Sequence, residues 1–240
     1  MMVCVDFGNT LVKAGIFEQG KMLNNLRTDY EQLHVLHRFI VDSQVSEIAV
    51  CNVSGNGDSI LSELAANLQI HHLTSATPLP FINEYKTPLT LGTDRIAAVA
   101  GAHMLFPETT CLIIDCGTCM TTDVITHDGV YKGGSISPGL QMRLKSMHTF
   151  TGKLPELDFK IPESITGNST AECMFSGAFH GMIAEIGYFA EHYAHSLGSC
   201  QLVLCGGDAE LFAEHLNLNI FAAPDLVLYG LYQIYRQHDS

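Results

Sequence analysis

The feature that most constrains this chain is a short sequence pattern that occurs twice. Residues 3–20 read V-C-V-D-F-G-N-T-L-V-K-A-G-I-F-E-Q-G, and residues 112–129 read L-I-I-D-C-G-T-C-M-T-T-D-V-I-T-H-D-G. Asp6 of the first copy corresponds to Asp115 of the second, 109 residues later, and the turn glycines keep the same offset. Each copy is an apolar run ending in Asp-x-Gly and followed by an alternating run, which predicts a strand, a tight turn and a returning strand. We therefore expect a fold with two similar halves.

The length of the chain agrees with two halves. A chain of 240 residues can form two domains of about 120 residues each, and the repeat places them at residues 1–108 and 109–240. Hydrophobic residues make up 47% of the chain and charged residues 15%, which indicates a packed core and not a disordered chain. Because strand and helix patterns alternate, we expect an α/β fold with a mixed sheet in each half.

The rest of the chain alternates between the two periodicities. Beyond the two hairpins, strands are predicted at Glu47–Val53, Gln69–Leu73, Gly129–Ile136, Gln201–Cys205 and Leu218–Ala222. Helices are predicted at Tyr30–Val41, Ser59–Leu68, Thr93–Phe106, after Pro138, and at Ala171–Leu197, Ala209–Leu216 and Asp225–Arg236. Residues 74–90 contain three prolines and are predicted to form a loop.

The charge and the apolar runs limit the partners. Lys and Arg number 12 against 25 Asp and Glu, a net charge of −13, which disfavours nucleic acid and anionic membranes as partners. No apolar run approaches the roughly 20 residues of a membrane span, and the first residues already form a predicted strand instead of a leader. The cysteines lie mainly in apolar runs, which is typical of reduced thiols in a cytoplasmic protein.

The repeated turns carry residues suited to phosphate and metal binding. Gly8 and Gly117 let the backbone approach a ligand closely, and the turn amides and the following threonines can bind phosphate oxygens. Asp6 and Asp115 end their strands and can hold a metal ion or its waters. The alternative is that these segments are ordinary hairpin turns, but two copies in the same register favour a functional role.

A second candidate site lies at residues 92–95, which read Gly-Thr-Asp-Arg. At the start of a predicted helix, the backbone amides and Arg95 attract a carboxylate or a phosphate, while Asp94 can accept a proton from a hydroxyl group. Without further motifs, the same residues would be an ordinary helix cap with a surface ion pair.

Further blocks give the chain a resemblance to a known family. The paired turns resemble the phosphate motifs of the superfamily of acetate kinases, sugar kinases, heat-shock chaperones and actin. In detail the chain resembles type III pantothenate kinases. The matching blocks, in order, are residues 6–10, 91–95, 115–118 with Thr121 and Asp123, 133–139, 153–155, 167–170 with 176–177, and 224–226. Each block alone is weak, but together they span nearly the whole chain.

This resemblance implies a fold, an activity and a set of site residues. The fold would be a duplicated actin-like (ribonuclease H-like) fold with an ATP cleft between its halves. The activity would be ATP-dependent phosphorylation of the terminal hydroxyl of pantothenate, the first step of coenzyme A synthesis. Asp94 would be the catalytic base. Pantothenate would be bound by Tyr85, Gly92, Thr93, Asp94, Arg95 and Thr170, and ATP by Asp6, Phe7, Gly8, Asn9, Thr10, Leu11, Val12, Lys13 and Thr118.

The resemblance also implies cofactors and an assembly. Asp115 would hold the monovalent cation, potassium or ammonium, and Mg²⁺ would accompany ATP. The protein would be a homodimer in which the helix predicted at Ala171–Leu197 pairs with its copy.

Two other functions and one other site remain open from the sequence. A non-catalytic regulator could use the same fold, although intact Asp6, Asp94 and Asp115 argue against a dead enzyme. A kinase or phosphatase of the same superfamily could act on another small hydroxyl compound.

Cys116 and Cys119 form a C-x-x-C motif, but a redox pair needs its first cysteine at a helix start, and structural zinc usually needs further ligands. We therefore expect neither role for this pair.

Overall fold

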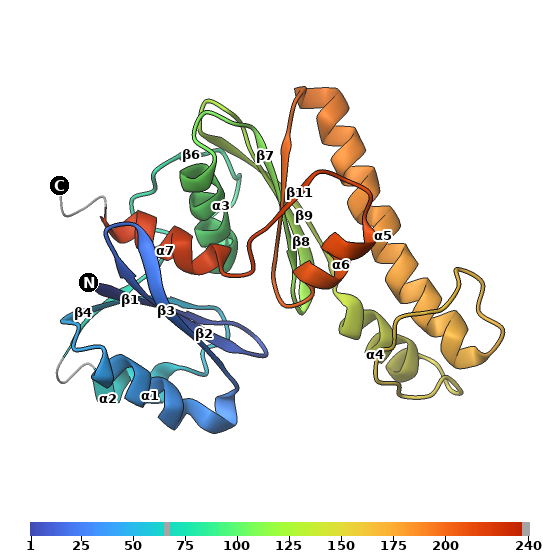
Figure 1. Cartoon of the computed structure of the whole chain (residues 1–240), viewed down its shortest axis with the longest axis horizontal. Coiled ribbons are helices and arrows are strands. Elements are labelled where there is room, and N and C mark those ends of the chain that lie inside the picture. Colours follow the sequence, from blue (N-terminus) through green and yellow to red (C-terminus); the bar gives the residue numbers. More distant parts are fainter. Residues whose placement is uncertain (65–67, 237–240) are drawn as a thin grey trace. The chain divides into compact units, whose positions relative to one another are not determined.

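The computed structural model describes residues 1–64 and 68–236 of the chain (Figure 1). Contacts divide the chain into two compact units. The first unit contains Met1–Thr109, Ile125–Gly133 and the end of the chain from Asp225, and the second contains Thr110–Val124 and Gly134–Pro224. The predicted domains, 1–108 and 109–240, describe a duplication of sequence and not a set of contacts, and this division stays a prediction.

The first unit is built on a five-stranded sheet. Its strands are β1 (Met2–Phe7), β2 (Val12–Glu18), β3 (Lys21–Thr28), β4 (Glu47–Asn52) and β5 (Gln69–His72). Their order in the sheet is β3-β2-β1-β4-β5. β1 pairs antiparallel with β2, as the sequence predicted, and parallel with β4. The sheet is therefore mixed, and β1 lies at its centre.

Helices cover both faces of this sheet (Figure 1). One face carries α1 (Leu33–Asp42) and α2 (Asp58–Leu64), and the other carries α3 (Thr93–Leu105) and α7 (Leu226–Arg236). Alternate residues of β1, beginning with Val3, pack in one cluster with residues of α1 and α2 because side chains alternate across a strand. The intervening residue Asp6 therefore points to the opposite face, where α3 and α7 lie.

α3 and α7 cross in close contact because each presents a glycine. A Cβ placed on Gly101 would lie 2.4 Å from the carbonyl oxygen of Leu226. A Cβ placed on Gly230 would lie 1.7 Å from the carbonyl oxygen of Ala97. No larger residue fits at either position without separating the helices, so these glycines fix the last helix of the chain against the helix that begins with the Thr-Asp-Arg block.

The second sheet has the same strand order as the first. Its strands are β7 (Cys111–Cys116), β8 (Cys119–Ile125), β9 (Val130–Pro138), β10 (Gln201–Cys205), β11 (Ile220–Ala222) and β6 (Ile82–Asn83). The order is β11-β10-β7-β8-β9-β6, so β9-β8-β7-β10-β11 repeats β3-β2-β1-β4-β5. β7 pairs parallel with β10 as β1 pairs with β4. The short strand β6 pairs with the beginning of β9 inside the first unit.

The helices of the second unit pack on a core dominated by one long helix. They are α4 (Leu140–Phe150), α5 (Thr170–Leu197) and α6 (Ala209–His215). The buried side chains of α5 recur at helical spacing, among them Phe175, Phe179 and Ile186, and they pack with residues of β7, β10 and α6. Ser169 caps α5 by accepting a hydrogen bond from the backbone amide of Glu172.

The sequence predicted these elements well, with three differences. β3 was not predicted because its side chains are mostly exposed and lack a continuous apolar run. The segment predicted as a loop at 74–90 contains β6 and a 3₁₀ turn at Pro88–Thr90. The helix predicted from Tyr30 begins with a 3₁₀ turn, Tyr30–Gln32. The end of the helix predicted at Ser59–Leu68 reaches residues 65–67, which lie outside the described residues.

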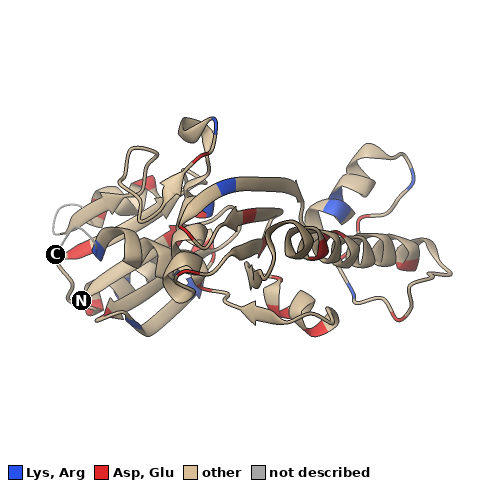
Figure 2. Ribbon diagram, turned by 90° about the horizontal axis from the view of Figure 1, so that it is seen from above, with Lys and Arg blue, Asp and Glu red and all other residues tan. Residues whose placement is uncertain are grey.

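Two properties of the whole chain bear on its partners. Asp and Glu are scattered over both units and Lys and Arg are sparse (Figure 2), as the net charge requires. Among the helices described, none combines the length and the hydropathy that a membrane crossing needs.

Candidate active site

The first Asp-x-Gly turn joins β1 to β2 and is open to solvent. The amide of Gly8 donates a hydrogen bond to the carbonyl oxygen of Leu11 at 3.1 Å. A Cβ placed on Gly8 would lie 3.1 Å from the same oxygen, so a side chain at this position would be a tight fit but is not excluded. Asn9 and Thr10 are exposed. The turn thus presents backbone and hydroxyl groups to a ligand, which is the arrangement that binds phosphate oxygens.

A tyrosine from outside the motif holds this turn. The hydroxyl of Tyr30 donates to the carbonyl oxygen of Gly8 at 2.5 Å and lies 2.7 Å from the Ser54 hydroxyl. Desolvation raises the pKa of Tyr30 above its ordinary value, and the charge of Asp6 adds to that rise against the hydrogen bond from Ser54. No sequence motif indicated Tyr30 or Ser54, because both reach the turn through tertiary contacts.

Asp6 and Lys13 come together through the register of the hairpin. They are Cα partners in the antiparallel pair β1–β2, and Asp6 is also the Cα partner of Cys51 in the parallel pair β1–β4. Asp6 is 8% exposed. A buried carboxylate at the end of a strand beside a lysine and a turn of backbone amides can order the metal ion and phosphates of a nucleotide.

The Thr-Asp-Arg block begins α3, as predicted. Asp94 Oδ1 accepts a hydrogen bond from the amide of Arg95 at 2.9 Å. A Cβ placed on Gly92 would lie 2.4 Å from the same Oδ1 atom, so only glycine at position 92 leaves room for this carboxylate. Arg95 is 6% exposed. The local sequence therefore fixes both a carboxylate and a buried guanidinium at one helix start.

Cys51 connects this helix start to the first turn. Its Sγ atom lies 3.2 Å from the hydroxyl of Thr93. Burial raises the pKa of the Cys51 thiol well above its ordinary value, and the charges of Asp6 and Asp94 raise it further. Both carboxylates are thus close enough to act on the same thiol. Within the first unit, the structure brings the predicted catalytic residue and the predicted ATP turn to one place.

Tyr85 is connected to the start of α3 by a contact with Arg95. The guanidinium carbon of Arg95 is 5.6 Å from the centre of the Tyr85 ring, within the range of a cation–π contact. Tyr85 also stacks with Tyr131 of β9, with ring centres 6.1 Å apart and planes 15° apart. Tyr131 is another residue that the sequence motifs did not indicate.

The second Asp-x-Gly turn joins β7 to β8 and is enclosed more tightly. The amide of Gly117 donates to the carbonyl oxygen of Cys119 at 3.2 Å, and the amide of Gly139 donates to that of Thr118 at 3.1 Å. A Cβ on Gly139 would lie 2.2 Å from the Gly117 carbonyl oxygen. Backbone from the Gly-Ser-Ile-Ser-Pro-Gly segment therefore packs directly on the turn, and Thr118 remains exposed.

A second segment of the same unit covers Asp115. Gly206 has a φ of +90°, and a Cβ on it would lie 2.4 Å from Asp115 Oδ1. The amide of Asp208 donates to the carbonyl oxygen of Cys116 at 3.0 Å. Desolvation raises the pKa of Asp208. Neither Gly206 nor Asp208 was predicted as a site residue, although the pattern of a strand followed by Gly-Gly-Asp could have indicated them.

The Cys-x-x-Cys motif has the environment of a structural thiol. Cys116 is buried in β7, and burial, followed by the charges of Asp115 and Asp208, raises the pKa of its thiol far above the ordinary value. Reactive cysteines need the opposite shift. Each cysteine in the described part of the chain is a free thiol.

Thr170 is the first residue of α5 and is exposed. It belongs to the second unit with Asp115 and Thr118, whereas the residues at 6–13 and 85–95 belong to the first. Each set is described within its own unit. In the described residues, no group of three or more His, Cys, Asp or Glu side chains is arranged to hold a metal ion.

Comparison with solved structures identifies the class of fold. The polyphosphate/ATP-glucomannokinase of Arthrobacter sp. strain KM matches with a TM-score of 0.52 at 14% identity, covering 99% of both chains. A Campylobacter jejuni protein provisionally described as a Baf family transcriptional activator matches with a TM-score of 0.65 at 18% identity, covering 99% of this chain and 98% of that one. The two mixed sheets are those of the actin-like sugar kinases and ATPases, which confirms the predicted fold class.

Sequence comparison then gives the family. A family profile described as type III pantothenate kinase matches residues 2–192. The Type III pantothenate kinase of Flavobacterium johnsoniae is 36% identical over 238 residues, which cover 98% of each chain. The chain belongs to the type III pantothenate kinase family.

Proposed function

We propose that this chain transfers the terminal phosphoryl group of ATP to the terminal hydroxyl of pantothenate, the first step of coenzyme A synthesis. Membership of the family supports the substrates. The observation that carries the mechanism is the contact from Asp6 through Cys51 to Thr93, with Asp94 beside it. This contact puts a candidate proton acceptor next to a candidate nucleotide turn.

Phosphoryl transfer depends mainly on alignment and charge neutralisation, because its transition state is loose. We assign the binding of ATP to residues 6–13, which form the open turn and include Lys13 opposite Asp6, and to Thr118. Mg²⁺ would arrive with the phosphates, and Asp6 is the carboxylate of this turn that would order it or its waters.

We assign the acceptor chemistry to the start of α3. Asp94 Oδ1 is held by the Arg95 amide, so Oδ2 is the oxygen that would take the hydroxyl proton. The acceptor oxygen then bonds to the transferred phosphorus while the bond to the departing ADP oxygen breaks. Arg95, Tyr85 and the backbone at 92–93 would bind pantothenate, with Thr170 as a further contact.

Asp115 would hold a monovalent cation, potassium or ammonium. Its surroundings suit such an ion, because Asp115 Oδ1 and the carbonyl oxygen of Cys116 both lie next to Gly206, 2.4 and 2.7 Å from where a Cβ on that residue would be, and carboxylate and carbonyl oxygens are the ligands of hard cations. When bound, the cation would supply positive charge near the phosphates in a protein that has few basic residues.

The remaining parts of the proposal concern assembly and location. We propose a homodimer that pairs through α5. The end of this helix presents aromatic side chains, with Tyr188 65% exposed and stacked on His192. We also propose a cytoplasmic location, which suits the free thiols and the supply of ATP.

A coupled assay of ADP release tests the activity. With pantothenate and Mg²⁺-ATP, we expect turnover that requires potassium or ammonium and a product heavier by one phosphoryl group. Phosphorylation of other hydroxyl compounds but not of pantothenate would favour a different kinase. An absence of turnover with every acceptor would favour a non-catalytic role.

The assignment of the base is tested by Asp94→Asn. We expect turnover to fall by about 10²- to 10⁴-fold, with little change in the KM for ATP. The exposed carboxylate of Glu18 at the end of β2 offers a matched control, and Glu18→Gln should leave both constants unchanged. Near-normal turnover in Asp94→Asn would show that another group accepts the proton.

A further inference from the structure

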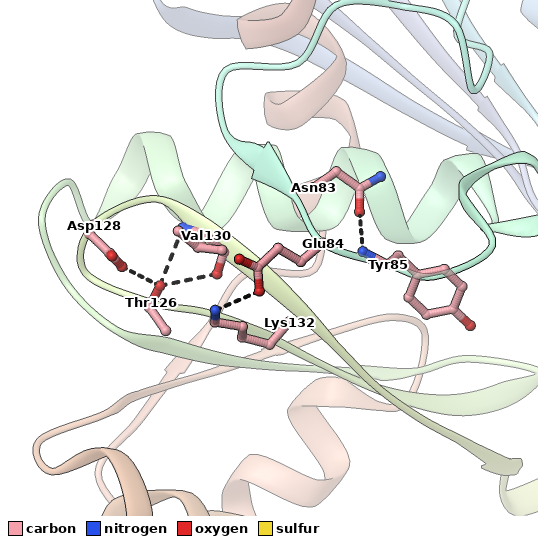
Figure 3. Close-up of polar contacts among 7 residues, drawn as sticks. All are labelled: Asn83, Glu84, Tyr85, Thr126, Asp128, Val130 and Lys132. Carbon is pink, nitrogen blue, oxygen red and sulfur yellow. Dashed lines mark hydrogen bonds and ion pairs between the residues drawn. The ribbon is translucent and has the colours of Figure 1, made fainter.

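The short strand β6 fixes where Tyr85 lies. β6 pairs in parallel with the start of β9, and the amide of Glu84 donates to the carbonyl oxygen of Tyr131 at 3.1 Å. The same register sets Glu84 beside Lys132, and the Lys132 Nζ atom is 2.7 Å from the Glu84 carboxylate. One residue further, Tyr85 comes beside Gly133. Figure 3 shows the ion pair of Glu84 with Lys132 beside the hydrogen bond from the Tyr85 amide to Asn83.

Local hydrogen bonds hold both strands of this pair. Asn83 Oδ1 accepts from the amide of Tyr85 at 2.9 Å, which fixes the backbone where the tyrosine leaves β6. At the turn before β9, the hydroxyl of Thr126 binds the Asp128 carboxylate and the carbonyl oxygen of Val130 (Figure 3). The position of the Tyr85 backbone is therefore determined by strand pairing and by its hydrogen bond to Asn83.

Gly133 provides the space that the Tyr85 ring occupies. A Cβ on Gly133 would lie 3.2 Å from Cδ2 and 3.4 Å from Cε2 of that ring, closer than most real Cβ contacts. Gly133 also has a φ of +94°, a conformation that L-residues rarely adopt. Two independent features thus require glycine at this position, and one of them is contact with the tyrosine.

Tyr131 supports the other side of the contact network. It is 0% exposed, it stacks with Tyr85 at 15° between the planes, and the ring of Phe81 meets it edge-on at 6.1 Å. Parallel offset and edge-on pairs are the favourable aromatic geometries. The fully buried Tyr131 therefore limits where the half-buried Tyr85 ring can go, and Tyr85 in turn contacts the Arg95 guanidinium.

We infer that Tyr131 and Gly133 are positioning residues that hold Tyr85 against Arg95 and so determine the affinity for an anionic acceptor. The contact with the Tyr85 ring limits where the Arg95 guanidinium lies, and the planar N–H groups of a guanidinium bind a carboxylate in two hydrogen bonds only when they are correctly placed. The inference rests on the proposed function because it takes pantothenate as the acceptor. Neither Tyr131 nor Gly133 is among the site residues predicted from the sequence.

Kinetics of Tyr131→Leu test the inference. We expect the KM for pantothenate to rise about tenfold through loss of the stacked geometry, while the KM for ATP stays unchanged. Tyr131→Phe keeps the ring and should behave as the wild type. Lys132→Met alters the residue between the two positions, whose side chain pairs with Glu84, and should change neither constant.

A structural effect on the whole unit is separated by a matched core variant. Phe17 is 0% exposed and stacks on Tyr232, away from Tyr85, so Phe17→Leu should lower the melting temperature without a selective rise in the KM for pantothenate. A wild-type KM for pantothenate in Tyr131→Leu overturns the inference. An equal rise of both KM values in Tyr131→Leu also overturns it.

A readout without substrate distinguishes this inference from the proposed function. Nitration of Tyr85 by tetranitromethane, located by mass spectrometry, should be faster in Tyr131→Leu than in the wild type and unchanged in Lys132→Met. If the wild-type protein does not phosphorylate pantothenate, the proposed function fails whatever the nitration result. Unchanged nitration of Tyr85 in Tyr131→Leu overturns the positioning role itself.

Discussion

The two Asp-x-Gly turns share a sequence pattern and a strand order, yet the protein holds them in different ways. In the first turn, the Gly8 amide reaches forward to Leu11, and one side-chain hydroxyl, that of Tyr30, binds the turn carbonyl. In the second, the Gly117 amide reaches only to Cys119, so the loop is shorter. The first turn is open with one side-chain support, and the second is compact.

Glycines from outside the motif bring backbone close to the second turn. Cβ atoms on Gly139 and Gly206 would fall 2.2 Å from a turn carbonyl and 2.4 Å from Asp115 Oδ1, whereas the turn glycines themselves are alike, with 2.9 Å at Gly117 and 3.1 Å at Gly8. Backbone therefore packs on the second turn where the first meets solvent. An open turn suits the large, multiply charged phosphates of a nucleotide, and a compact turn lined by oxygens suits a single small cation.

The neighbouring strands differ in the same sense. Asp6 is the Cα partner of Cys51 and Asp115 that of Cys205 in equivalent parallel pairs. Cys51 then contacts Thr93 at the start of α3, which links the first turn to the acceptor site. The strand of Cys205 continues instead into Gly206, whose backbone covers Asp115. The two copies of the motif thus differ in the residues that follow the partner strand, and this difference is the basis on which we propose two different tasks for them.

The largest effect is expected from adding one methyl group at Gly206, which packs against the second turn, and the matched change is one methyl group at Gly8 of the first turn. Gly206→Ala strains a residue at φ +90° and overlaps the Asp115 carboxylate, so we expect activity to fall by about 100-fold through misplacement of that group. Gly8→Ala meets only a contact at 3.1 Å and should cost about tenfold or less. Initial rates at saturating potassium, with circular dichroism as a folding control, compare the two. A greater loss in Gly8→Ala would reverse our comparison.

A smaller effect is expected from the hydroxyl that holds the first turn. Tyr30→Phe removes the bond to the Gly8 carbonyl, which we expect to raise the KM for ATP by about three- to tenfold, the value of one hydrogen bond. Dependence on potassium should not change. Ser54→Ala removes only the second partner of that hydroxyl and serves as the milder control. A shift in potassium activation in Tyr30→Phe would show that the turns are not separate in function.

The smallest effect concerns Asp208 beside the second turn. Its folded-state pKa is raised by desolvation, so the folded state holds this proton more tightly than the unfolded state, and stability falls as the pH rises from the unfolded to the folded pKa. Asp208→Asn should therefore be more stable than the wild type at neutral pH, by less than about 1 kcal/mol for a half-exposed group.

Thermal melts across pH, in buffers without potassium, check this expectation. The difference between the two proteins should shrink as the pH falls below the unfolded pKa, where both carry a neutral side chain. A variant that is less stable than the wild type at neutral pH would show that Asp208 is stabilised by a partner and not penalised by burial.

The sequence predicted what depends on local pattern. The hairpin strands, the helix that begins at Thr93 and the long helix α5 follow from apolar periodicity, and the similarity of the two mixed sheets follows from the repeat. It missed β3 because an exposed edge strand needs no apolar run. It missed β6 because two residues paired to a distant strand leave no periodicity of their own.

The candidate site divides in the same way. Motif residues such as Asp6 and Asp94 could be found because their turns and caps are local. Tyr30, Cys51 and Tyr131 could not, because each acts through contacts with residues far away in the sequence. Tyrosine and cysteine are common packing residues, so these three positions cannot be distinguished from ordinary core positions in the sequence.

A potassium titration of three proteins tests the division between the turns most directly. Initial rates are measured against potassium, at fixed ionic strength with sodium, for the wild type, Asp6→Asn and Asp115→Asn. We predict that Asp115→Asn gives the same low rate in potassium and in sodium while its KM for ATP stays near that of the wild type. Asp6→Asn should keep potassium activation and lose affinity for Mg²⁺-ATP. Wild-type potassium activation in Asp115→Asn would contradict this division.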